Sequence, residues 1–289
     1  MSEPPRDPQP DAGVQPAPGA PHDHGVRWAL TKVPQIIVLF WLSKIVITAM
    51  GEATSDYMNA ALGPAIAVPI MLIGLCVALK LQFKQDRYVA SNYWLVVVAI
   101  AVFGTSAADA LHVGLGIAYP VSTAFYAVVL AWVFTAWYRS EGTLSIHSIY
   151  TPRRERYYWA TVFATFALGT AAGDMTAIAM HLGYFASGLL FTGLILIPLI
   201  AWRIGLNPIV AFWFAYILTR PLGASFADWL DNPHRLGGLA LGTGPVALGL
   251  AIIVAGVMAY LARTRIDVKR EPAHAPAHAM LVPDSAATI

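Results

Sequence analysis

Four aspartates recur with the same neighbours in the apolar middle of this chain. Each follows a tryptophan by 15 residues and a glycine by five, and another aromatic residue precedes each tryptophan. They are Asp56, Asp109, Asp174 and Asp228. A carboxylate inside a bilayer costs roughly 3 kcal/mol on insertion scales, so four at one repeat position should face protein, water or a cation.

The residues around the aspartates favour a site for a divalent cation. At 1.5 Å per helical residue, 15 residues place every aspartate about 22 Å beyond its tryptophan, so the carboxylates share one depth. Glu52, Thr105 and Thr170 lie one turn earlier on the same helix face, and His112 and His181 are candidate outer ligands. Carboxylate and hydroxyl oxygens with an imidazole suit Mn²⁺ or Mg²⁺, while the single Cys76 argues against a soft-metal site.

A structural interpretation of the same residues stays open. The aspartates could cap helices or bond across a repeat interface without any ion. We expect Arg220 to form an ion pair with a carboxylate of another repeat, and Lys44 either to reach the interface or to pair with a carboxylate. The repeated glycines predict close helix packing, and the four tryptophans predict anchors at the membrane interface.

The composition predicts an integral membrane protein. Of 289 residues, 57% are hydrophobic and 12% are charged, against roughly 25% charged in soluble domains. Eight apolar runs are long enough to cross a bilayer. They cover about 34–56, 64–83, 92–112, 118–138, 157–178, 184–203, 209–230 and 242–263. The expected fold is all-α, with eight spans as four two-helix hairpins in parallel orientation and the odd-numbered spans inside.

The distribution of lysine and arginine predicts the orientation. Nearly all of them fall in the tails and in every second connection, whereas the other connections contain only Arg235. Both termini should therefore be cytoplasmic. The net charge of +2 is too small and too dispersed to indicate a nucleic-acid partner.

The aspartate spacings of 53, 65 and 54 residues divide the chain into two matching halves. We expect a disordered cytoplasmic tail over 1–29, a first half over 30–138 and a cytoplasmic loop over 139–156. A second half should follow over 157–263, with a second disordered tail over 264–289. Parallel repeats predict an axis along the membrane normal.

The aromatic-Trp start and the Gly-to-Asp finish, present in all four segments, resemble a family of bacterial membrane-anchored proteins built from a repeat of unknown function. The resemblance covers about residues 30–263 and implies a multi-pass protein of the bacterial inner membrane, but no activity. From the residues themselves we expect a transporter that exports a divalent metal such as Mn²⁺ or exchanges it for protons.

Two other functions stay open at this stage: a membrane scaffold that binds a partner, and a haem- or quinone-linked redox protein using the outer histidines. No phosphate loop, HExxH motif or catalytic triad order is present, so the protein should not be an enzyme. No resident cofactor is expected, the metal being substrate. The expected partners are the lipid bilayer and the cation, and an oligomer is compatible with the sequence.

Overall fold

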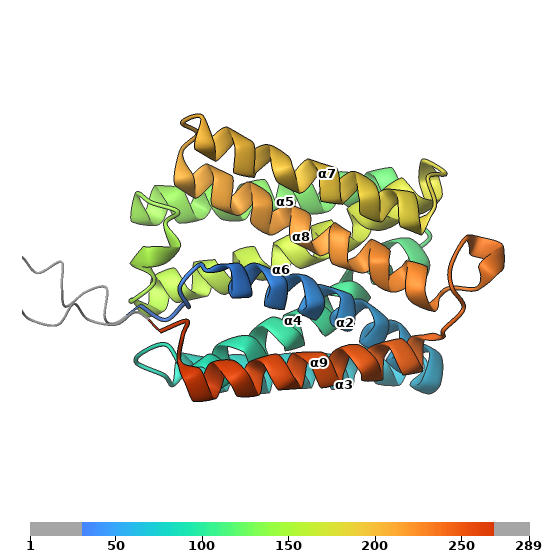
Figure 1. Cartoon of the computed structure of the whole chain (residues 1–289), viewed down its shortest axis with the longest axis horizontal. Helices are drawn as coiled ribbons and strands as arrows, with labels where there is room; N and C mark the ends of the chain where they lie inside the picture. Colours follow the sequence, from blue (N-terminus) through green and yellow to red (C-terminus); the bar gives the residue numbers. More distant parts are fainter. Residues whose placement is uncertain (1–30, 269–289) are drawn as a thin grey trace, which may run out of the picture.

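The computed structural model describes residues 31–268, which contain eight long helices and no strand (Figure 1). All eight are long and apolar enough to cross a membrane. In chain order they are α2 (Val38–Leu62), α3 (Pro64–Phe83), α4 (Ala90–Asp109), α5 (Tyr119–Glu141), α6 (Pro152–Asp174), α7 (Tyr184–Arg203), α8 (Pro208–Asp231) and α9 (Thr243–Thr264).

Ordinary helix signals set the ends of these spans. Proline occupies the start of α3, α5, α6 and α8, where its missing N–H removes no helical hydrogen bond. Thr151 and Asn207 cap α6 and α8 by accepting backbone N–H groups of Arg154 and Ile209. Gly142 ends α5 in the left-handed region, with φ of 68°.

The odd-numbered spans form the interior of the bundle, as the sequence predicts. In the most apolar stretch of each helix, 50% to 61% of the residues are buried in α2, α4, α6 and α8. In α3, α5, α7 and α9 the share is 22% to 28%. Each inner helix packs against two other inner helices, in the order α2, α4, α6, α8 and back to α2. The inner helices therefore close a ring.

The outer helices join neighbouring repeats. Instead of packing mainly on the inner helix before it, α3 lies on α4, α5 on α6 and α7 on α8. The last outer helix, α9, lies on the first inner helix, α2, and so closes the outer layer as well. The arrangement is pseudo-fourfold, and each repeat depends on the next for its apolar packing.

The repeated glycine is the point of closest approach within the ring. A Cβ on Gly51 would overlap Ala101, one on Gly104 would lie 3.0 Å from Phe166 Cβ, and one on Gly169 would overlap Arg220. A Cβ on Gly223 would overlap Thr48 of the first repeat. In every case the neighbour lies three residues before the glycine of the following repeat, so the four contacts are equivalent. The predicted packing role of these glycines is confirmed.

We expect Gly223→Ala to lower the free energy of unfolding by about 1–3 kcal/mol, because the added methyl group overpacks the α8–α2 contact. Gly249 is the matched control, since a Cβ there meets no atom within 4 Å. Gly249→Ala should leave stability unchanged or raise it slightly. Thermal unfolding of the two variants in detergent measures the difference, and equal stability would argue against close packing at Gly223.

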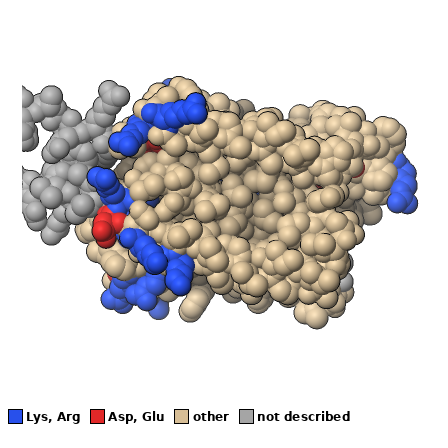
Figure 2. Space-filling view, turned by 90° about the horizontal axis from the view of Figure 1, so that it is seen from below, with Lys and Arg blue, Asp and Glu red and all other residues tan. Residues whose placement is uncertain are grey.

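Lysine and arginine gather at the end of the bundle where the described chain begins and ends (Figure 2). The middle of the face shown in Figure 2 is almost entirely without charged residues. This end is also closed by buried polar contacts: Lys32 pairs with Glu155 at 2.7 Å, and Gln82 donates to the same carboxylate at 2.9 Å. We call it the basic end.

The packed chain continues past the predicted boundary at residue 264. Asp267 is buried and accepts hydrogen bonds from the Tyr88 hydroxyl and through its backbone oxygen from the Gln35 N–H. Burial raises the pKa of Tyr88, which keeps the hydroxyl protonated as a donor. The predicted tails otherwise lie outside the described residues.

The prediction that all four repeat tryptophans face the membrane interface is wrong for three of them. Trp94, Trp159 and Trp213 are buried in the main apolar core, and Trp213 donates to the backbone oxygen of Leu144 at 2.9 Å. The inner helices begin their ring contacts at the basic end, so their first aromatic residues fill the centre instead of the rim. Only Trp41 remains partly exposed.

Candidate functional site

A fully buried arginine lies where the four inner helices meet. Arg220 stands on α8, three residues before Gly223, and its exposed fraction is 0%. The absence of a side chain on Gly169 leaves room for the Arg220 stem, since a Cβ there would overlap Arg220 Cβ and Cγ. The repeat glycine thus admits the largest polar side chain of the ring.

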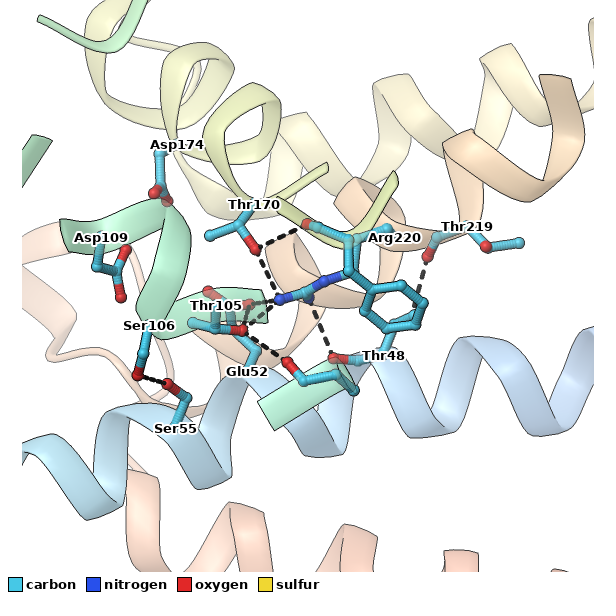
Figure 3. Close-up of polar contacts among 12 residues, drawn as sticks. Thr48, Glu52, Ser55, Thr105, Ser106, Asp109, Thr170, Asp174, Thr219 and Arg220 are labelled. Atoms are coloured by element: carbon cyan, nitrogen blue, oxygen red, sulfur yellow. Dashed lines mark hydrogen bonds and ion pairs between the residues drawn. The ribbon is translucent and has the colours of Figure 1, made fainter. Parts of the chain in front are cut away.

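The Arg220 guanidinium contacts all three of the other repeats (Figure 3). It forms an ion pair with Glu52 of the first repeat, and donates to Thr105 of the second and to Thr170 of the third, the last at 2.7 Å. It also donates to the backbone oxygen of Thr48 at 3.2 Å. This is the ion pair with another repeat expected for Arg220, and it engages one carboxylate oxygen of Glu52 and the hydroxyls of Thr105 and Thr170.

Lys44 lies closer to the basic end. Within the described part of the chain it neither reaches the membrane interface nor pairs with a carboxylate, the two outcomes expected from the sequence. It is 1% exposed, so it does not reach the interface, and among residues 31–268 no carboxylate lies within ion-pair distance. Its ammonium donates to Thr219 at 2.7 Å and lies 3.7 Å from the centre of the Tyr216 ring. Lys44 and Arg220 therefore place two basic side chains between the basic end and the aspartates.

On α8, Asp228 follows Arg220 by eight residues, about 12 Å of helix at 1.5 Å per residue, so the aspartates lie further from the basic end than the Arg220 backbone. They come together in two groups. In the first, His112 Nε2 lies 3.2 Å from Asp109 Oδ1 and 3.4 Å from Asp174 Oδ2. His112 is 9% exposed, and its Nδ1 has no hydrogen-bond partner among the described residues.

A change of helix type positions this first group. A π-helix begins directly after each of the two aspartates: η1 covers Ala110–Gly114 and η3 covers Met175–Ala179. Such wide turns rotate the following side chains and occur preferentially at functional sites. By contrast, α2 and α8 continue as regular α-helix beyond Asp56 and Asp228.

The second group joins the first and fourth repeats. One carboxylate oxygen each from Glu52, Asp56 and Asp228 lies within 4.8 Å of the others. Glu52 therefore belongs to two sets of contacts, the ion pair with Arg220 and this acidic group. The oxygens of Asp109, Asp174 and the His112 nitrogen satisfy the same distance limit.

The structure thus brings most predicted site residues into one region, but Lys44 and His181 lie outside it. His181 is exposed in the connection before α7, with φ of 57°, and belongs to neither group. Thr48 and Thr219, which contact Arg220 and Lys44, are not among the residues predicted from the sequence. The cross-repeat alignment held a signal for Thr48, since it occupies the repeat position of Arg220.

Comparison with known families matches the chain in four stretches to the family described as Repeat of Unknown Function (DUF347). The matched residues are 39–88, 92–143, 157–204 and 211–267. Each stretch covers most of one inner helix and the outer helix that follows it, so the predicted fourfold repeat is confirmed. No curated protein and no solved structure matches the chain.

Proposed function

Because the chain belongs to the Repeat of Unknown Function family, whose description names no activity, we propose from its geometry that it transports a divalent cation. Mn²⁺ is the best-fitting substrate, moved across the inner membrane of a bacterium by export or in exchange for protons. The eight apolar helices would cross the bilayer, with the basic end and both termini in the cytoplasm. The aspartates would then lie in the outer half of the membrane.

The group of Asp109, His112 and Asp174 carries this proposal. Two ligands at right angles on an ion, each bound at about 2.1 Å, are roughly 3 Å apart. The distances of 3.2 and 3.4 Å from His112 Nε2 to the two carboxylates are close to that spacing. A cation bound between these three atoms would replace their direct contacts. One imidazole and two carboxylates form a mixed ligand set that suits Mn²⁺.

The second acidic group would link ion binding to the contacts that hold the inner helices together, because Glu52 belongs to both. A cation held by Glu52, Asp56 and Asp228 would compete with Arg220 for the Glu52 carboxylate. Loss of that ion pair would leave Arg220 bound to the first repeat only through the backbone oxygen of Thr48. Since Arg220 and Lys44 block a cation on the direct path to the basic end, transport requires them to move.

Uptake by proteoliposomes tests the transport proposal. Vesicles containing the full-length protein should accumulate Mn²⁺ above the level of empty vesicles. Asp109→Asn with Asp174→Asn should abolish that difference, because the amides remove both negative charges from the ligand set. Asp86→Asn is the control, since Asp86 is exposed at the basic end. Wild-type uptake equal to that of empty vesicles would refute transport.

A membrane scaffold is the second candidate, favoured by the contacts of Arg220 with all three other repeats. In that case the polar residues would hold the ring together without carrying an ion. If the protein is a scaffold, Asp109→Asn with Asp174→Asn should bind as much Mn²⁺ as wild type and should have a lower unfolding temperature. The transporter predicts loss of binding in a folded protein.

A further inference from the structure

A cavity of about 560 Å³ lies between α2, α7, α8 and the connection from α5 to α6. Its volume falls in the range of roughly 300–1,000 Å³ typical of small-molecule sites. Apolar side chains dominate the lining, including Trp41, Ile195 and Phe212. Water gains few hydrogen bonds in such a space, so an apolar occupant is favoured.

The cavity lies at the basic end of the bundle and not beside the aspartates. Its lining on α8 extends from Pro208 to Ala215, roughly 11 Å of helix from the start. On α7 it is confined to the second half of the helix, which ends at Arg203. In the proposed orientation this is the depth at which lipid headgroups give way to acyl chains.

The α7 side of the cavity faces outward. Leu196, Leu199 and Trp202 line it and are 49%, 50% and 46% exposed, respectively. In a membrane these side chains would meet lipid, so a chain could enter from the bilayer. The polar end of such a molecule would remain near the basic end, where lysine and arginine gather (Figure 2).

Arg203 supplies the complementary charge. Its guanidinium lies 5.4 Å from the centre of the Trp202 ring, and Trp202 is part of the lining. An arginine held beside an apolar cavity at the headgroup level attracts a phosphate. We propose that this cavity binds an anionic phospholipid, with one acyl chain inside it and the phosphate beside Arg203. The proposal is independent of the transported ion.

Native mass spectrometry of the full-length protein tests the site. The probes are phosphatidylglycerol, which is anionic, and phosphatidylcholine with the same acyl chains, each added in mixed micelles. Wild type should retain one phosphatidylglycerol in preference to phosphatidylcholine. Ala215→Trp should lose this lipid because the indole fills the cavity, whereas Ala255→Trp, on the exposed face of α9, should retain it.

Arg203→Gln tests the headgroup contact at an exposed position where folding is not at risk. It should reduce the preference for phosphatidylglycerol roughly fivefold, the contribution of one basic residue at a membrane surface. Equal lipid retention by Ala215→Trp and Ala255→Trp would show unspecific surface lipid and overturn the proposal. A dimer that dissociates in Ala215→Trp would also overturn it, because a second copy would then fill the cavity.

Discussion

Glu52→Leu is expected to lower the free energy of unfolding by about 3–5 kcal/mol, because it leaves Arg220 buried without its counter-charge. Arg220 is 0% exposed and Glu52 is 4% exposed, so water cannot replace the lost partner. Thermal and denaturant unfolding of the purified protein in detergent measure the effect. Because Arg220 links its own repeat to the other three, the whole bundle should unfold in one cooperative transition.

A second substitution shows whether the unpaired charge causes that loss. Glu52→Leu combined with Arg220→Met should recover most of the stability, since a buried ion pair can be replaced by apolar residues of similar volume. Glu141→Leu is the control: Glu141 pairs with Arg154 near the surface, where such pairs contribute about 1 kcal/mol or less. A double variant no more stable than Glu52→Leu would show that the loss comes from packing and not from charge.

His112→Gln is expected to lower the affinity for Mn²⁺ by at least 10–100-fold, the range roughly seen when only an outer partner of a metal ligand is lost. The change removes the one nitrogen that lies between Asp109 and Asp174. Affinity for Mg²⁺ should change less, because Mg²⁺ prefers oxygen ligands and retains its waters. Isothermal titration of both ions into the folded variant gives the two ratios.

His181→Gln is the matched control for this experiment. The sequence offers His181 as an equally plausible outer ligand, but the structure leaves it exposed and outside both acidic groups. Its replacement should not change the affinity for either ion. If both histidine variants lost affinity equally, the site would not be the one formed by Asp109, His112 and Asp174.

The sequence predicts the architecture well because the repeat and the bilayer restrict it strongly. Apolar length gives the eight helices, and the Trp, Gly and Asp positions give the fourfold repeat. The odd-numbered spans carry all the intramembrane carboxylates, and this is sufficient to place them inside. The equivalent contacts of Gly51, Gly104, Gly169 and Gly223 follow from the same repetition.

The details of the site depend on differences between the repeats, which the repeat pattern does not determine. Arg220 occurs in one repeat only, and its partners are fixed by how far its side chain reaches across the ring. The π-helices after Asp109 and Asp174 bring these two residues together with His112, and nothing in the local sequence predicted a wide turn. The sequence also does not predict the burial of the tryptophans, because that burial depends on where along their length the inner helices begin to contact one another.

The location of bound Mn²⁺ is the most direct test of the cation site. Pulsed electron paramagnetic resonance of the Mn²⁺-loaded protein detects nitrogen coordinated to the ion. We predict coupling to a single imidazole nitrogen, present in wild type and His181→Gln and lost in His112→Gln. Bound Mn²⁺ without nitrogen coupling, or with coupling that persists in His112→Gln, would contradict the assignment of Asp109, His112 and Asp174 as its ligands.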